Sequence, residues 1–406
     1  MREVLTFILA GGKGERLDPL TRDRAKPAVP FGGIYRIIDF TLSNCINSGL
    51  RRIFVLIQYK SFSLQKHILA GWNIFSNQLG EFIDVIPPQQ RIGSDWYKGT
   101  ADAIYQNFYA IADYEPKHVL ILAGDHIYKM DYRKMIDYHK QMNADMTVAC
   151  IQVPAQSAGH FGVIEADAKN RVCGFQEKPQ NPKTVPGNPS SIFASMGIYL
   201  FSREVLNLEL ESDAHAASEH DFGKNVIPQM LKNNRKIYMH NFVDENNQPK
   251  YWRDIGTRDA YYQANMDLVR VPSAFDLYNR QWPVRTYHEQ YPPIKIVSMD
   301  QQVAVNHGAI VDSLISGGCV IKGAQVIRSV LSSNVNIEND ASITDSVLME
   351  GVIVGAHAKI KNAIIDKEVV IPAHSQIGYD LELERKRFAV TTSGIVIVAK
   401  KASVKD

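Results

Sequence analysis

Apolar and polar positions follow two different rules along this 406-residue chain. From the N-terminus to about Leu268, short apolar runs alternate with stretches whose apolar residues recur at helical spacing. Several runs lack a polar alternation, which is typical of strands covered on both faces. The strands predicted in this way are Leu5–Ala10, Ile53–Ile57, Val119–Ala123, Thr147–Val153 and Ile198–Phe201.

Helical spacing is clearest in Ala101–Ala112 and Tyr132–Met142, which lie between predicted strands. Strands that alternate with helices indicate a mostly parallel sheet with helices on both faces. The sequence therefore predicts an α/β, Rossmann-like, doubly wound domain over residues 1–272.

The second rule begins near Val297, where apolar residues recur every six positions. This period predicts short strands, one on each side of a triangular parallel β-helix. A sandwich of alternating strands is the alternative, but a period of two does not produce a spacing of six. We expect a parallel β-helix of hexapeptide repeats over residues 297–406, and a resemblance to a known protein family further implies that it is left-handed and has a role in regulation and oligomerisation. The repeating positions are Ile315, Ile321, Ile327, Ile337, Ile343, Met349, Val354, Ile360, Ile365, Ile371 and Ile377.

Residues 273–296 separate the two patterns and show no clear period. The segment contains Pro283, Pro292 and Pro293 with several aromatic residues, whereas glycine and serine are scarce. This composition indicates a packed linker rather than a flexible one.

Composition excludes several classes of protein. Hydrophobic residues make up 45% and charged residues 22% of the chain, as in ordinary globular proteins. The formal net charge of +2 provides no electrostatic argument for binding nucleic acid or an anionic membrane. No apolar run reaches the ~18 residues that a membrane helix needs. The four cysteines lack paired spacing, which favours free thiols and a cytoplasmic location.

The first candidate for chemistry is the glycine-rich segment Leu9–Leu17, which directly follows the first predicted strand. Glycines let backbone N–H groups approach phosphate oxygens, and basic side chains neutralise the phosphate charge. The segment lacks the ending of a P-loop and the spacing of a dinucleotide fingerprint, so a structural turn is the alternative. Lys26 lies ten residues after Arg16 and precedes Pro27, which biases the lysine toward an extended backbone. Arg16 and Lys26 together suit a triphosphate.

The segment from Gly11 to Pro27 resembles the nucleotidyltransferases that join a nucleotide to a sugar 1-phosphate. Within them, the chain is most similar to the bacterial ADP-glucose pyrophosphorylase (glucose-1-phosphate adenylyltransferase) family, over essentially its whole length. The other segments that carry the resemblance are Phe31–Phe40, Ser43–Gly49, Trp96–Ala103, Ala123–Tyr128, Glu177–Pro179, Ser195–Tyr199, His220–Lys224 and Tyr251–Thr257.

The resemblance implies that Arg16, Lys26 and Asp125 are catalytic and that Asp125 and Asp254 bind Mg²⁺. Asp125 follows a predicted strand, at the edge of a parallel sheet where ligands bind. Two carboxylates with phosphate oxygens and water suit Mg²⁺. Taken locally, either aspartate also fits a helix cap or a turn.

The resemblance also implies two substrate sites. Lys178 is expected to bind the sugar phosphate, and carboxylates and hydroxyls are expected to accept hydrogen bonds from the sugar. The residues expected at ATP are Leu9, Ala10, Gly11, Gly12, Gly14, Gln58, Tyr97, Gly99 and Thr100. The residues expected at glucose 1-phosphate are Tyr97, Gly162, Glu177, Lys178, Ser195, Tyr199, Asp221 and Trp252.

The implied reaction converts ATP and glucose 1-phosphate into ADP-glucose, the glucosyl donor for glycogen, and pyrophosphate. The attacking phosphate is already an anion because its second pKa is ~6, so no general base is needed. Three alternatives stay open: another nucleotide or sugar, a regulatory subunit without turnover, and acyl transfer on the β-helix.

The resemblance further implies a homotetramer controlled by small-molecule effectors. Arg24 and Arg36 match effector-binding positions of the family. Asp23 stands where enteric enzymes have a lysine needed for activation by a sugar bisphosphate. We therefore do not expect fructose 1,6-bisphosphate to activate this protein.

Overall fold

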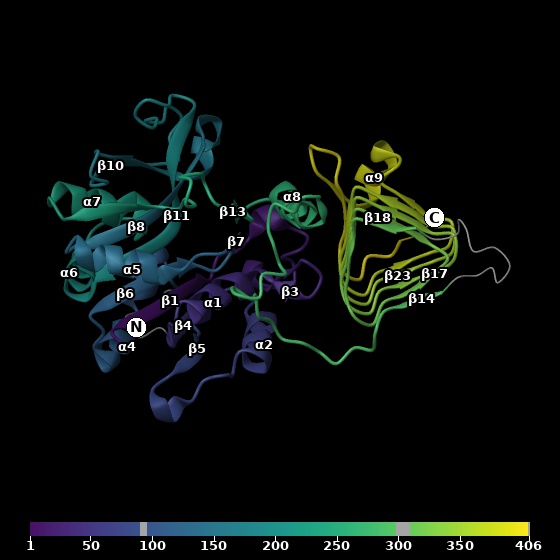
Figure 1. Ribbon diagram of the computed structural model, residues 1–406, viewed down its shortest axis with the longest axis horizontal. Coiled ribbons are helices and arrows are strands. Elements are labelled where there is room, and N and C mark those ends of the chain that lie inside the picture. The colour runs from purple at the N-terminus through teal and green to yellow at the C-terminus, as the bar shows by residue number, and fades with distance from the viewer. Residues whose placement is uncertain (90–95, 298–308, 405–406) are drawn as a thin grey trace.

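The computed structural model describes residues 1–89, 96–297 and 309–404. An α/β domain forms one half of the molecule and a β-helix the other, as Figure 1 shows. The α/β domain contains a nine-stranded sheet with the main strand order β10-β9-β11-β6-β1-β4-β5, to which β8 and β12 add at β11. Both predicted fold classes are confirmed.

Four neighbouring strands around β1 are parallel. Leu9 lies opposite Leu56 of β4 on one side and Ala123 of β6 on the other, so three strands end at nearly the same level. This edge is where ligands bind in open α/β sheets. The four strands are β1 (Val4–Ala10), β4 (Arg52–Ile57), β5 (Phe82–Ile86) and β6 (His118–Ala123).

The rest of the sheet is mainly antiparallel and is built around β11 (Ser191–Ser202). The strand is longer than the predicted Ile198–Phe201, because after an irregularity at Ser195 its first half continues to pair with β8. Apolar pattern alone missed this half. The remaining strands are β8 (Met146–Pro154), β9 (Gly162–Ala166), β10 (Val172–Glu177) and β12 (Ile237–Asn241).

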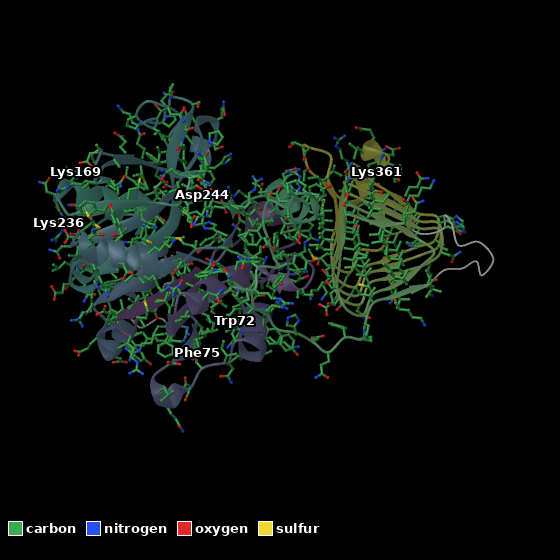
Figure 2. The ribbon with its side chains drawn as sticks, in the orientation of Figure 1. Trp72, Phe75, Lys169, Lys236, Asp244 and Lys361 are labelled. Atoms are coloured by element: carbon green, nitrogen blue, oxygen red, sulfur yellow. The ribbon has the colours of Figure 1, made fainter. Side chains whose placement is uncertain are left out.

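Helices cover both faces of the sheet, and side chains fill the layers between them (Figure 2). Along β1, Val4 and Ile8 face the core beneath α1, α2 and α5, whereas Leu5 and Phe7 face the core beneath α3, α4, α6 and α7. The predicted doubly wound arrangement is therefore confirmed. The helices are α1 (Ile37–Asn47), α2 (Phe62–Gly71), α3 (Thr100–Tyr105), α4 (Phe108–Tyr114), α5 (Tyr132–Gln141), α6 (Arg203–Ala214), α7 (Ile227–Lys232) and α8 (Arg258–Val269).

The prediction of one continuous helix over Ala101–Ala112 is wrong, because α3 and α4 are separate. The side-chain amide of the buried Asn107 donates to the carbonyl of Ala103 (2.7 Å) and to the hydroxyl of Tyr97 (3.0 Å). Such local bonds by asparagine compete with helical backbone bonds. By contrast, α5 agrees with the predicted Tyr132–Met142 to within one residue.

Short elements carry the residues at the edge of the sheet. The strand β13 (Trp252–Asp254) pairs with β7 (His126–Tyr128), and Asp254 lies opposite His126. Two 3-10 turns follow the glycine loop, η1 (Glu15–Leu17) and η2 (Lys26–Ala28), and a small hairpin joins β2 (Pro30–Phe31) to β3 (Tyr35–Arg36).

The linker packs against the α/β domain. Trp282 donates to Asn44 (2.9 Å), and Thr286 donates to the buried Asp39 (2.7 Å). The predicted boundaries at residues 272 and 296 stay predictions, although Lys295 already pairs with β17 of the β-helix.

Three parallel sheets form the sides of the β-helix. Ile321, Ile337, Val354 and Ile371 lie in register on one side and are buried, as the six-residue period predicts. The first sheet contains β14 (Lys295–Val297), β17 (Val320–Lys322), β20 (Asn336–Ile337), β23 (Ile353–Val354) and β26 (Val370–Ile371). The second contains β15 (Ile310–Val311), β18 (Gln325–Ile327), β21 (Ser342–Thr344), β24 (Lys359–Lys361) and β27 (Gln376–Ile377). The third contains β16 (Leu314–Ile315), β19 (Val330–Leu331), β22 (Val347–Leu348), β25 (Ala363–Ile365), β29 (Val396–Val398) and the antiparallel β28 (Ala389–Val390), which follows α9 (Leu381–Arg387).

Among the described residues, none of the helices has the length and apolar character required to cross a bilayer.

Candidate active site

A cavity of about 580 Å³ lies at the carboxyl edge of β1, β4 and β6. It brings together residues from both halves of the sheet and from the β7–β13 pair. The predicted site residues that line it are Leu9, Gly11, Gly12, Gln58, Tyr97, Gly99, Thr100, Asp125, Gly162, Glu177, Lys178, Ser195, Tyr199, Asp221, Trp252 and Asp254.

The glycine loop forms one wall of the cavity, directly after β1. Gly14 has a φ of +69°, and a Cβ atom there would lie 3.2 Å from Cβ of Lys26. Glycine is therefore required both for the backbone conformation and for the close approach of Lys26. The hydroxyl of Thr21 donates to the carbonyl of Gly14 (2.8 Å) and joins the loop to the turn that follows. The predicted Ala10 and Gly14 are not among the lining residues of the cavity.

Lys26 lies between the two predicted metal-binding carboxylates. Its Nζ atom is 2.6 Å from Asp125 and 3.3 Å from Asp254. Asp125 follows β6, whereas Asp254 ends β13, and the pairing of β13 with β7 brings the two together. The guanidinium of Arg16 also lies close to Asp254. A Cβ atom placed on Gly256 would be 3.3 Å from Nη2 of Arg16 and 2.8 Å from the Asp254 carboxylate.

The charges of this group stabilise one another. Burial disfavours the charged ammonium of Lys26, but the two carboxylates outweigh this effect and raise its pKa. Burial also disfavours the Asp125 carboxylate, but Lys26 and His126 outweigh that effect and lower its pKa. Both carboxylates also line the cavity, so the group is accessible to a further cation.

The same carboxylates can hold a divalent metal. Ligand atoms of Asp125, His126 and Asp254 all lie within 4.8 Å of one another. Carboxylate oxygens are the hard ligands that Mg²⁺ prefers, and the ammonium of Lys26 demonstrates that their oxygens converge on a cation. Sequence reasoning missed His126, whose Nε2 atom is 3.5 Å from Asp125. The position of His126 directly after Asp125 in the sequence was the signal that could have indicated its place in this group.

A second group of polar residues, which includes Asp221, also lines the cavity, and the hydroxyl of Thr100 donates to Asp221 (2.9 Å). Nζ of Lys178 is 3.0 Å from Glu177, and Lys178 has a φ of +47°. Asp221 accepts bonds from the backbone N–H groups of Gly223 (2.9 Å) and Lys224 (3.1 Å). Asp221 therefore also caps the helical turn Phe222–Val226, a structural role that the sequence analysis did not assign to it.

Aromatic residues lie in and beside the cavity. The rings of Tyr59 and Trp96 stack with their centroids 6.1 Å apart, and the ammonium of Lys13 lies 5.7 Å from the centre of the Tyr59 ring. Gln58 donates to the carbonyl of Tyr97 (3.3 Å). Sequence reasoning also missed lining residues outside the segments that carry the resemblance, among them Tyr59, His160, Phe161 and Phe175, and it assigned no role to Gly197 within Ser195–Tyr199.

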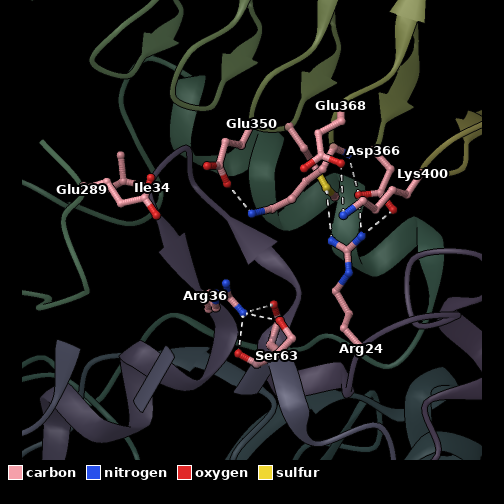
Figure 3. A network of polar contacts seen from close by, with 12 residues as sticks. Arg24, Ile34, Arg36, Ser63, Glu289, Glu350, Asp366, Glu368 and Lys400 are labelled. Carbon is pink, nitrogen blue, oxygen red and sulfur yellow. Dashed lines mark hydrogen bonds and ion pairs between the residues drawn. The ribbon is translucent and has the colours of Figure 1, made fainter. Parts of the chain in front are cut away.

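The two predicted effector residues lie outside this cavity, between the α/β domain and the β-helix (Figure 3). Arg24 is ion-paired with Asp366, at 2.7 Å. Arg36 donates to the hydroxyl of Ser63 (2.7 Å) and lines a separate cavity of about 90 Å³ together with Lys367. Their role in binding effectors stays a prediction.

Comparisons with known proteins agree with this architecture. The chain matches the family described as "Nucleotidyl transferase" over residues 5–270 and the family described as "GlmU-like, C-terminal hexapeptide" over residues 292–398. Glucose-1-phosphate adenylyltransferase of Koribacter versatilis is 50% identical over 408 residues, covering 100% of this chain and 97% of that protein. The corresponding enzyme of Rhodopirellula baltica is 50% identical over 98% of this chain and 90% of its own length. Glucose-1-phosphate adenylyltransferase 2 of Vibrio cholerae is 48% identical over 98% of both chains. The chain therefore belongs to the nucleotidyl transferase family, and within it to the glucose-1-phosphate adenylyltransferases.

Proposed function

We propose that this protein transfers the adenylyl group of ATP to glucose 1-phosphate and releases pyrophosphate and ADP-glucose. One observation carries the proposal. A single cavity joins a glycine-rich phosphate loop to a polar end containing Glu177, Lys178 and Ser195, and the carboxylates of Asp125 and Asp254 also line it. Such a cavity suits two anionic substrates that meet at a metal-binding pair of carboxylates.

ATP binds at the end formed by the glycine loop. The backbone N–H groups of Gly11 and Gly12 face the polyphosphate, and Arg16 and Lys26 neutralise its charge. Gln58 and Tyr97, joined by a hydrogen bond, adjoin the base and ribose. As the bond to pyrophosphate breaks, the ammonium of Lys26 stabilises the departing oxygens, which carry more charge than in bound ATP.

Glucose 1-phosphate binds at the opposite end. Lys178 holds the phosphate, while Glu177, Ser195 and Asp221 accept hydrogen bonds from sugar hydroxyls. Tyr199 and Trp252 form the apolar walls. The phosphate needs no base to activate it, because its second pKa is ~6 and it is an anion at neutral pH. The residues act by holding its oxygen in line with the α-phosphorus of ATP.

Asp125 and Asp254 would hold Mg²⁺, which supplies charge neutralisation for the phosphate oxygens when bound. Lys26 already contacts both carboxylates, at 2.6 and 3.3 Å. A divalent ion held by the same carboxylates would lie close to the Lys26 ammonium, so Lys26 would meet the polyphosphate from this position.

A pyrophosphate-release assay tests the proposal. The chain is incubated with Mg²⁺ and glucose 1-phosphate, and with ATP, dTTP, UTP, CTP or GTP in separate reactions. We expect release with ATP and at most slow release with the others. Preference for another nucleotide would contradict the adenylyl assignment, and absence of turnover with every nucleotide would favour a regulatory subunit.

The wider role is part of the same proposal. The product supplies activated glucose for glycogen synthesis in the cytoplasm, and the protein works as a homotetramer whose activity responds to small-molecule effectors near Arg24 and Arg36. Because the exposed Asp23 cannot bind a phosphate as lysine does, fructose 1,6-bisphosphate is not expected to activate it. Sedimentation and assays with sugar phosphates, pyruvate and adenine nucleotides check these points.

A further inference from the structure

One short segment, residues 24–28, contacts both halves of the molecule. The side chain of Arg24 extends to Asp366 of the β-helix, and the side chain of Lys26 extends to Asp125, which lines the active-site cavity. Arg24 and Lys26 are separated by a single residue, so their Cα atoms lie within about 7 Å of each other. A displacement of the Arg24 backbone is therefore expected to shift the backbone of Lys26.

The contact with the β-helix is tight. Nη2 of Arg24 is 2.7 Å from both carboxylate oxygens of Asp366, and the two side chains are 7% and 1% exposed (Figure 3). Asp366 follows β25, and its backbone N–H donates to the carbonyl of Val398 (3.0 Å). The backbone N–H of Lys367 donates to the Asp366 carboxylate (2.7 Å). The sheet of the β-helix therefore holds the carboxylate in one position.

The backbone around the two contacts is restricted by hydrogen bonds and by a proline. The backbone N–H of Ala25 donates to the carbonyl of Lys60 (3.1 Å), and that of Val29 donates to the carbonyl of Lys26 (3.1 Å). Pro27 lies inside the 3-10 turn and restricts its backbone. Only Ala25 separates Arg24 from this turn, so the backbone has little freedom to absorb a shift at Arg24 before it reaches Lys26.

Lys26 requires accurate placement at the other end. Its Nζ atom fits between two carboxylates at 2.6 and 3.3 Å, and its Cβ atom passes close to Gly14. A misplacement of 1 Å in a catalytic site can reduce the rate by about a hundredfold.

We infer that Asp366, in the β-helix, is a positioning residue for adenylyl transfer: through Arg24 it holds Lys26 at the Asp125–Asp254 pair. This inference rests on the proposed function for the role of Lys26. It gives the β-helix a part in the chemistry although none of its described residues lines the active-site cavity.

A second contact between the two halves provides a matched control. The hydroxyl of Tyr262 on α8 donates to the carbonyl of Asp345 in the β-helix (2.6 Å), away from residues 24–28. Tyr262→Phe weakens the attachment of the β-helix without touching Arg24. If Asp366 merely fastens the two halves together, the two variants behave alike.

The experiment compares wild type, Asp366→Asn and Tyr262→Phe in the full chain with ATP, glucose 1-phosphate and Mg²⁺, without effectors. We expect Asp366→Asn to lower kcat by about ten- to a hundredfold, with less than about threefold change in either KM, because Lys26 acts on the departing pyrophosphate. Tyr262→Phe is expected to keep kcat within about twofold. Crystals of Asp366→Asn should have Nζ of Lys26 beyond hydrogen-bonding distance of Asp125.

Two results would overturn the inference: a folded Asp366→Asn with wild-type kcat, or an equal loss in Tyr262→Phe. If Asp366→Asn does not fold, Arg24→Lys decides, because it keeps the charge and loses the planar fork. Unchanged kcat in Arg24→Lys overturns the positioning role. If the wild type is inactive, the proposed function is overturned instead. If crystals of Asp366→Asn still have Lys26 at Asp125, the positioning role of Asp366 is overturned independently.

Discussion

Arg24 and Lys26 are two buried cations on the same turn, and they meet carboxylates in two different settings. Arg24 faces one carboxylate, Asp366, and both side chains are almost fully enclosed. Lys26 faces two carboxylates, Asp125 and Asp254, which line an open cavity. Both contacts join residues that are far apart in the sequence.

The difference separates a structural ion pair from a ligand-binding group. At Arg24 the charges cancel, and neither Arg24 nor Asp366 is among the residues that line the active-site cavity or the cavity at Arg36. At Lys26 the two carboxylates line a cavity that admits a ligand. A buried pair adds little net stability, but it becomes costly when one partner is removed. The Lys26–Asp125–Asp254 group, in contrast, gains a further charged partner when a ligand enters the cavity.

The largest effect on kcat is expected at the Lys26–Asp125–Asp254 group. Asp125→Asn should lower kcat about 10³-fold, equivalent to about 4 kcal/mol of transition-state stabilisation, with little change in either KM. The thermal unfolding temperature should change little, because Asp254 still pairs with Lys26 and the site adjoins solvent. Asp131→Asn, which alters the cap of α5, is the matched control and should keep wild-type kcat. Normal turnover in Asp125→Asn would remove this carboxylate from the metal site.

For the enclosed Arg24–Asp366 pair, the next largest effect is expected on the stability of the fold. Asp366→Leu leaves Arg24 buried without a counter-charge and should lower the free energy of unfolding by about 3 kcal/mol, measured by guanidinium denaturation. The double variant Arg24→Met, Asp366→Leu should recover most of this stability. If the double variant is as unstable as the single one, the pair contributes more than charge compensation.

A smaller effect is expected at the acceptor end of the cavity. Lys178→Gln should raise the KM for glucose 1-phosphate about tenfold, equivalent to about 1.4 kcal/mol, and leave kcat within a few fold. Lys178 is 53% exposed, so water replaces part of what is lost. Lys169→Gln, an exposed lysine outside the cavity (Figure 2), is the control. An unchanged KM would reject the phosphate-binding role of Lys178.

The most gradual effect, which develops only as the pH falls, concerns a buried group that stays neutral. His139 lies between the hydroxyls of Thr147 (2.8 Å) and Ser202 (3.3 Å), and burial lowers its pKa to about 3. Between this value and the ordinary pKa of ~6.5, the unfolded chain binds a proton that the folded chain does not. Stability should therefore fall with decreasing pH, by at most about 1.4 kcal/mol per pH unit. His139→Gln should flatten this slope, and equal slopes would place the acid sensitivity elsewhere.

Local pattern alone determined much of this protein. The six-residue period placed Ile337, Val354 and Ile371 in the interior of a β-helix, because a coil repeats the same environment at each turn. The glycine loop and Asp125 could be placed at one edge because parallel strands end there. These inferences needed only residues close in sequence and a general rule of sheet topology. The roles of single residues came from the resemblance to a family, and they stay predictions until they are measured.

Only the tertiary structure decided which distant residues meet. The pairing of β13 with β7 sets Asp254 beside Asp125, and no local signal in β13 specifies that partner. Asn107 divides a helix because its amide finds Ala103 and Tyr97, which the apolar pattern does not record. Arg24 meets Asp366 across 342 residues of sequence. Charges of this kind resemble ordinary surface residues until the packing of two domains removes the water around them, and that removal is a property of the whole fold.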